Sequence, residues 1–149
     1  MFLGSGTHGD TPVRLKVLHQ CEGLGANECK RPGSFGGGGV IWKDKWVLEK
    51  LSSIFCLEPA GDTPFRRSIT DSVALGCIPV LFNEASDYTS DLLWSGWRNS
   101  SRVLVPRKAF LDGHIHMESL LAAVPKDVLQ AMQSTLRTYA RRFQSSLAE

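Results

Sequence analysis

The 149 residues, 42% of them hydrophobic and 21% charged, are expected to form a single globular domain over 1–149 around one hydrophobic core. The formal net charge of +2 comes from scattered basic residues, which argues against a nucleic-acid partner. No apolar stretch approaches the roughly 20 residues that span a bilayer, and the start MFLGSGTHGD lacks the charged and apolar regions of a signal peptide.

The first thirty residues predict one strand and one helix. Met1–Leu3 reads as a short strand that leads into GSGTHGD, a turn rich in glycine and small polar residues. Val13, Val17 and Cys21 recur at four-residue spacing, which predicts an amphipathic helix over 13–21.

A glycine-rich segment comes next. Residues 31–45, RPGSFGGGGVIWKDK, contain four consecutive glycines, and because ordering glycine is entropically costly we expect a loop or linker there. A short helix is predicted over Trp46–Leu51, with Trp46, Val47 and Leu51 facing a sheet.

The run SIFCLEPAGDTPFRRSITDSVALGCIPVLF, residues 53–82, predicts a right-handed βαβ unit. Its apolar runs, 54–57 and 77–82, are typical of buried strands, although Pro79 in the second cannot donate to a ladder. Residues 58–62 form a turn. We expect the helix to begin at Thr63 and Pro64, to bury Phe65, Ile69 and Val73, and to end at Gly76.

A ligand of such a unit binds beyond the carboxyl ends of the strands, and an anion favours the helix N-terminus. Gly61 and Asp62 lie in that turn, and Arg66 and Arg67 of the first helical turn can bind phosphate oxygens. Asp71, one to two turns further on, can accept hydrogen bonds from ribose hydroxyls. The alternative, in which Arg67 and Asp71 form an ordinary i,i+4 surface pair, stays open.

The rest of the chain predicts one strand and two helices. Residues 83–99 carry Tyr88, Trp94 and Trp97, for which sugar stacking and anchoring of a loop to the core both stay open. We expect a strand over 102–106, a helix over 117–124 stopped by Pro125, and a long helix over about 126–147. The apolar stripe of that last helix is Leu129, Met132, Leu136, Tyr139 or Ala140, Phe143 and Leu147.

The cysteines and histidines do not predict a metal site. The four cysteines include no CxxC pair, and His114 and His116 have no second cluster in the sequence. Cys56 and Cys77 each lie in a predicted strand, and we interpret them as small buried hydrophobic residues.

The segment FCLEPAGDTPFRRSITDSVALGCIPVLF closely resembles the signature of exostosin-like glycosyltransferases, glycosyltransferase family 47. The resemblance is strongest to the plant xyloglucan galactosyltransferase branch, whose pattern is roughly FCLQPxGDxxxRRSxFDSxLAGCIPVxF. The match is long and ungapped, and its departures include Thr70 and Leu75, neither of which is a polar ligand position. Weaker similarity extends from Phe2 to the C-terminus.

The resemblance implies an α/β fold with a Rossmann-like parallel sheet flanked by helices, the C-terminal, donor-binding half of a GT-B glycosyltransferase. It places Asp71 where these enzymes hold the nucleotide ribose. Further donor-binding candidates that it implies are Ser68, Gly4, Ser5, Thr7 and Arg14. For Arg14, a solvent-facing position is the alternative. Residues 31–45 replace a strand that is usual in the family, which leaves the sheet order open.

Relatives also carry cysteines near Cys21 and Cys29, so the resemblance is compatible with a lumenal disulfide between them. Family members are usually type II Golgi membrane proteins with an anchor and a preceding acceptor domain. The chain as given has neither, and we therefore expect a truncated gene model, a fragment or a stand-alone half.

The function implied is inverting transfer of a sugar from a nucleoside diphosphate sugar, UDP-linked, to a glycan hydroxyl. Arg66, Arg67, the helix N-terminus and the Gly61 loop would stabilise the departing diphosphate, so no metal cofactor is expected. The general base is expected in the missing N-terminal domain, which leaves the activity of the isolated chain open. Two alternatives are a non-catalytic nucleotide-sugar or glycan-binding module and an unrelated Rossmann-like protein, although the GxGxxG turn of the latter is missing.

Overall fold

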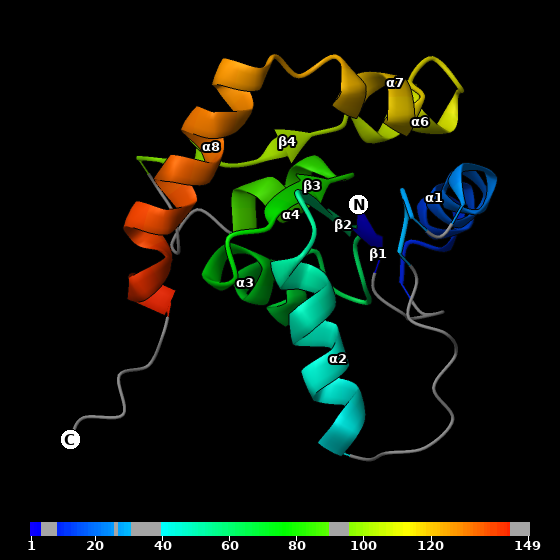
Figure 1. The fold of residues 1–149 in the computed structure, drawn as a ribbon. Helices are drawn as coiled ribbons and strands as arrows, with labels where there is room; N and C mark the ends of the chain where they lie inside the picture. Colours follow the sequence, from blue (N-terminus) through cyan, green and yellow to red (C-terminus); the bar gives the residue numbers. More distant parts are fainter. Residues whose placement is uncertain (4–8, 26, 31–39, 90–95, 144–149) are drawn as a thin grey trace.

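The structure is a computed structural model that describes residues 1–3, 9–25, 27–30, 40–89 and 96–143. Four parallel strands form one sheet in the order β1-β2-β3-β4. They are β1 (Phe2–Leu3), β2 (Phe55–Glu58), β3 (Ile78–Leu81) and β4 (Val103–Leu104). Helices flank the sheet (Figure 1), so the predicted α/β class with a parallel sheet is confirmed.

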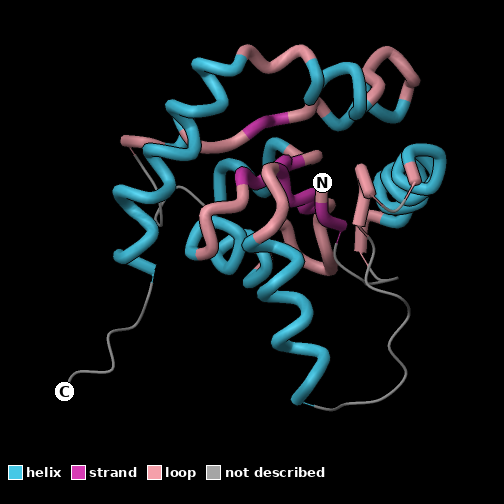
Figure 2. Tube along the Cα trace, in the orientation of Figure 1, coloured by secondary structure: helices cyan, strands magenta, loops and turns pink. Residues whose placement is uncertain are grey.

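The helices group into a few contacting sets. Helix α1 packs against α6 and α7, whereas α3 lies beside the short helix η2 that continues α8 (Figure 2). Their bounds are α1 (Thr11–Leu24), α2 (Val40–Leu51), α3 (Arg67–Ala74), α4 (Glu84–Thr89), η1 (Arg98–Ser100), α6 (Arg107–Leu111), α7 (Met117–Ala122), α8 (Lys126–Tyr139) and η2 (Ala140–Phe143).

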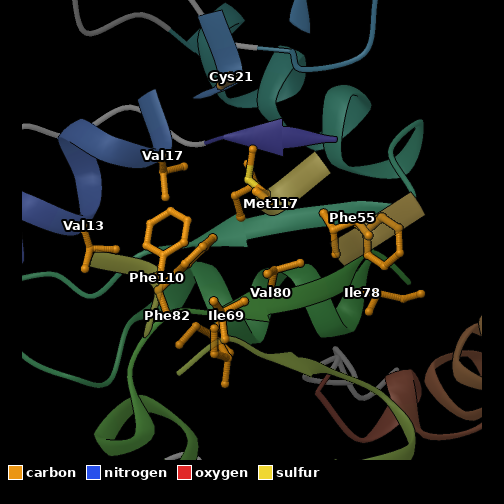
Figure 3. Close-up of a cluster of buried hydrophobic side chains, with 14 of the residues drawn as sticks. Val13, Val17, Cys21, Phe55, Ile69, Ile78, Val80, Phe82, Phe110 and Met117 are labelled. Carbon is orange, nitrogen blue, oxygen red and sulfur yellow. The ribbon is translucent and has the colours of Figure 1, made fainter. Parts of the chain in front are cut away.

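The main core forms around the two central strands. Val13 and Val17 of α1 are buried there as predicted, together with Phe110 of α6. Figure 3 shows the ring of Phe110 beside that of Phe82, and their centroids are 5.0 Å apart. Because side chains alternate along a strand, Phe55 of β2 joins this core while its neighbour Cys56 belongs to a separate cluster.

The βαβ unit is confirmed, but its first boundaries shift. Ile54 is 45% exposed and precedes β2, and Glu58, expected in the turn, is the last strand residue. The expected helix start at Thr63 and Pro64 is wrong, since α3 begins at Arg67 and the Thr63 hydroxyl instead donates to the backbone oxygen of Phe65. Phe65 therefore lies outside the helix and is 40% exposed.

The end of α3 follows the prediction. Gly76 has φ +74°, and the two backbone bonds of a Schellman motif are present, from Gly76 to Val73 and from Cys77 to Ser72. Pro79 is tolerated within β3 because successive residues of a central strand bond alternately to the strand on one side and to the strand on the other. Ile78 donates toward β2, so the position without an N–H faces the β4 side, where pairing begins only at the next residue, Val80.

The segment 31–45 is not a loop throughout. Residues 31–39 lie outside the described part, but α2 begins at Val40 rather than at Trp46. The predicted inward face is also partly wrong, since Val47 and Leu51 are 41% and 55% exposed. Trp46 does pack on the buried cluster, and the residue one turn later on the same face is the buried Lys50.

The C-terminal elements are close to those predicted. Helices α7 and α8 and strand β4 are present. Helix α8 continues as η2 to Phe143, and the predicted helix end near 147 lies outside the described residues. Two further helices, α4 and α6, were not predicted from the sequence. Trp97 is buried and stacks on Tyr139, which supports the anchoring interpretation, while Tyr88 is 78% exposed and Trp94 lies outside the described residues.

Both pairs of cysteines form disulfides. The bond between Cys21 and Cys29 agrees with the resemblance. The interpretation of Cys56 and Cys77 as free buried residues is wrong, because they are bonded to each other with their Cα atoms 5.7 Å apart. Cys56 lies on β2 and Cys77 directly precedes the neighbouring β3, and this adjacency depends on strand register.

Candidate donor-binding site

A hollow of about 520 Å³ lies where β2 ends and α3 begins. Its walls are Gly61, Asp62, Thr63, Phe65, Arg66, Arg67 and Ser68. The structure thus brings five of the predicted site residues, from the turn and from the first helical turn, around one space. Its place beyond the carboxyl end of a central parallel strand is where open α/β sheets bind ligands.

Two glycines permit the close packing of this turn. A Cβ on Gly9 would lie 2.3 Å from the backbone carbon of Gly61, so the loop after β1 touches the loop after β2. A Cβ on Gly61 would in turn lie 3.0 Å from Nε and 3.3 Å from Cζ of Arg66. The Arg66 side chain therefore lies directly over Gly61, and a side chain at this position would displace it by a few tenths of an ångström.

Arginine side chains hold the carbonyl groups of the same turn. Arg14 is 4% exposed and donates to the backbone oxygens of Ala60 and Pro59, over 3.2 and 3.1 Å. Arg66 also donates to the oxygen of Pro59, over 3.2 Å. The solvent-facing alternative for Arg14 is therefore wrong. Its contact with a donor stays a prediction, and what the geometry shows is that it fixes the turn.

The turn also carries backbone N–H groups at Gly61 and Asp62. Among the described residues, none accepts a hydrogen bond from the backbone N–H of Gly61 or Asp62. Arg66 is the N-cap residue of α3, and burial lowers the pKa of its guanidinium from the usual value, because the charged form loses water there. Unpaired N–H groups beside a partly desolvated cation form a suitable environment for an anion.

A second hollow of about 510 Å³ adjoins the first, between α2 and α3. Arg67 and Ser68 line both hollows, whereas Arg66 lines only the first and Asp71 only the second. The Arg67 side chain is 93% exposed, and its Nε lies 3.9 Å from Oδ1 of Asp71. The i,i+4 pair of the alternative interpretation is thus present, but it is loose and leaves Arg67 able to turn toward a ligand.

A further ion pair borders the same sheet edge. Asp10, directly before α1, accepts two bonds from Arg107 at the start of α6, with lengths of 2.6 and 2.9 Å. The hydrogen bond to Asp10 raises the pKa of Arg107. Asp10 follows β1 and Arg107 follows β4, the two outermost strands. The ion pair therefore joins the segments that leave the two edge strands at their carboxyl ends.

Comparison with known proteins gives this arrangement a family. The model of the exostosin GT47 domain matches residues 2–112. The chain belongs to the exostosin GT47 family. The probable xyloglucan galactosyltransferase GT15 of Arabidopsis thaliana is 32% identical over 83% of this chain. The xyloglucan galactosyltransferase MUR3 is 36% identical over 83%, and the xyloglucan-specific galacturonosyltransferase 1 is 39% identical over 58%, both from the same plant.

The matches cover only part of each relative. They span 26%, 20% and 13% of the lengths of these three proteins, in the order given. Activities named for the relatives therefore belong to chains several times the length of the matched region.

Sequence reasoning missed one pair of residues in this exostosin domain. Lys50 and Glu58 are 2% and 5% exposed, and Lys50 Nζ lies 3.1 Å from Glu58 Oε1 behind the first turn of α3. A signal was available, because Lys50 follows Trp46 by one helical turn on the predicted inward face, and Glu58 directly extends a buried strand.

Some predicted site residues remain untested. Gly4, Ser5 and Thr7 lie outside the described residues. Within the described ranges, no three His, Cys, Asp or Glu side chains gather in a way that could hold a metal ion. Among the helices that the structure describes, none has the length and apolar character needed to cross a bilayer.

Proposed function

We propose that this exostosin chain is the donor-binding half of an inverting GT-B glycosyltransferase whose donor is a UDP-linked sugar and whose acceptor is a glycan hydroxyl. The observation that carries the proposal is the hollow beyond β2, where Arg66 lies over Gly61 and α3 begins. A sugar nucleotide presents a diphosphate, and guanidinium groups bind phosphate oxygens with two parallel hydrogen bonds.

Each site residue has a proposed role. Arg66, Arg67 and the N–H groups of the Gly61 turn stabilise the negative charge that develops on the departing diphosphate. Because this task is electrostatic, the proposed reaction does not require a metal ion. The ribose extends past Arg67 and Ser68 into the second hollow, where Asp71 accepts bonds from its hydroxyls.

Inversion also requires a general base within hydrogen-bond reach of the acceptor hydroxyl. Asp10 is engaged by Arg107 through both carboxylate oxygens, which makes it unsuitable. We therefore assign the base to an acceptor domain outside this chain, as the length of the relatives suggests. The same observation favours a second candidate, a nucleotide-sugar-binding module without activity. Release of sugar from UDP-sugar in the presence of an acceptor domain separates the two.

The proposed location is the Golgi lumen. Two disulfides join all four cysteines of the chain. Disulfides persist in oxidising compartments, to which the secretory pathway belongs.

The proposal is tested by calorimetry with UDP on the purified chain. Arg67→Ala and Asp71→Ala are each expected to weaken binding about tenfold or more, since each removes a hydrogen bond that involves a charged group. The matched control is Lys108→Ala, in another exposed i,i+4 pair with Asp112. Equal UDP affinity in the unmodified chain and both site variants would remove the donor-site assignment.

A further inference from the structure

A buried polar cluster joins three elements behind the candidate donor site. Lys50 comes from α2, Glu58 ends β2, and Ser68 and Ser72 lie one turn apart on α3. Ser72 is fully buried, like the two charged residues. The ammonium of Lys50 donates to the Ser72 hydroxyl over 2.6 Å and to the backbone oxygen of Ser68 over 2.7 Å.

Both oxygens of the Glu58 carboxylate accept hydrogen bonds. The Ser72 hydroxyl lies 2.6 Å from Oε1, and the Ser68 hydroxyl donates to Oε2. Since the two serines belong to successive turns, one carboxylate holds the first half of α3 against the end of β2. Hydrogen bonds are directional, and these two fix both the rotation of the helix and its position along the strand.

Ser68 connects the buried cluster with the surface. It lines both hollows, directly follows Arg67 in the chain, and turns its hydroxyl inward to Glu58. Any movement of this turn of α3 would therefore move Arg67 and the N-cap residue Arg66 relative to the Gly61 turn.

We propose that Glu58 is a positioning residue for the diphosphate of the donor, acting through its bonds to Ser68 and Ser72. Lys50 supplies the charge that lets the carboxylate stay buried. The inference rests on the proposed function and adds to it a group that does not touch the ligand. Ile69 and Val73 of α3 also pack in the core, but an apolar contact in place of Glu58 would lack the two directional bonds to Ser68 and Ser72.

Two double variants separate positioning from stability. Lys50→Met/Glu58→Gln and Lys50→Met/Glu58→Leu both remove the buried charges, but only glutamine can still bond to Ser68 and Ser72. Calorimetry with UDP and with uridine, which lacks the diphosphate, is combined with the melting temperature of each full-length variant.

The glutamine variant is expected to bind UDP within about threefold of the unmodified chain, and the leucine variant at least tenfold more weakly at a similar melting temperature. Uridine affinity is expected to agree within about threefold between the two double variants, because both replace Lys50 of the second hollow and the difference between them concerns the phosphate-binding groups. Arg102→Met is the control, since it breaks the pair with Asp87, bonded over 2.6 and 2.8 Å, and should lower the melting temperature without changing UDP affinity.

The outcomes distinguish this inference from the function on which it rests. If the unmodified chain binds UDP and both double variants bind it equally, the positioning role is wrong and the donor site stands. If the unmodified chain does not bind UDP, the proposed function fails and the positioning role fails with it. A parallel loss of UDP and uridine affinity in the leucine variant also contradicts the inference, because it indicates general disturbance of the site.

Discussion

The two faces of strand β2 are held by different interactions. Phe55 and Leu57 face the main apolar core, whereas Cys56 forms a disulfide and Glu58 pairs with Lys50 on the opposite face. An apolar face tolerates substitutions of similar volume, but a buried charge depends on one partner. The face that adjoins the candidate donor site is therefore expected to be the less tolerant of the two.

The largest expected effect follows from breaking the buried pair. Lys50→Met leaves the Glu58 carboxylate buried without its counter-charge, which costs about 3–5 kcal/mol of unfolding free energy. Ile78→Val, a matched loss of one methylene from the apolar core, is expected to cost about 0.5–1.5 kcal/mol. Urea unfolding with the disulfides intact measures both.

The double variant Lys50→Met/Glu58→Gln sharpens this comparison. With both charges removed, the unfolding free energy is expected to return to within about 1.5 kcal/mol of the unmodified chain. If Lys50→Met alone costs no more than Ile78→Val, the pair is hydrated and the two faces of β2 do not differ as described.

The second expected effect concerns the disulfide beside that pair. Cys56→Ala/Cys77→Ala releases a loop closed over 21 residues of separation, for which chain entropy predicts a loss of about 3 kcal/mol. Cys21→Ala/Cys29→Ala opens a separation of 8 and should cost somewhat less, about 2.5 kcal/mol. Thermal unfolding of the two double variants under identical conditions compares them, and a larger loss for the shorter loop would contradict the entropic account.

The sequence predicts one of these faces better than the other for a physical reason. Apolar periodicity is local, so it located α1, the βαβ unit and the glycine that ends α3. The partners of Cys56 and Glu58 depend on strand register and on how α2 crosses the sheet, which no local pattern contains. The interpretation of Cys56 as a free residue was wrong because its partner, Cys77, is brought beside it only by the pairing of β2 with β3.

The same limit applies to the candidate site. The turn around Gly61 and the arginines at the start of α3 were predicted because they lie within seven positions, at the junction of strand and helix that the local βαβ pattern already indicates. The buried hydrogen bonds from Arg14 to that turn join residues 45 and 46 positions apart in the sequence. Only the family resemblance pointed to Arg14. The sequence thus predicts site residues that are close together in the chain, but it does not predict the distant residues that fix their positions.

The smallest expected effect on stability comes from Gly61→Ala. Gly61 is not among the glycines with positive φ in the described chain, so an added Cβ strains no backbone and should change the unfolding free energy by less than about 1 kcal/mol. The Cβ would nevertheless lie 3.0–3.3 Å from atoms of the Arg66 side chain, which must shift by a few tenths of an ångström. UDP affinity is therefore expected to fall by up to about tenfold, because the Arg66 guanidinium is displaced relative to the turn.

Gly23→Ala provides the matched control for this last substitution. It lies within α1, and no heavy atom is found within 4 Å of its added Cβ, so it should stabilise the chain by about 0.5–1 kcal/mol and leave UDP affinity unchanged. Calorimetry on both variants compares them directly. If Gly61→Ala binds UDP as Gly23→Ala does, the position of Arg66 over the turn is a property of the fold and does not contribute to donor binding.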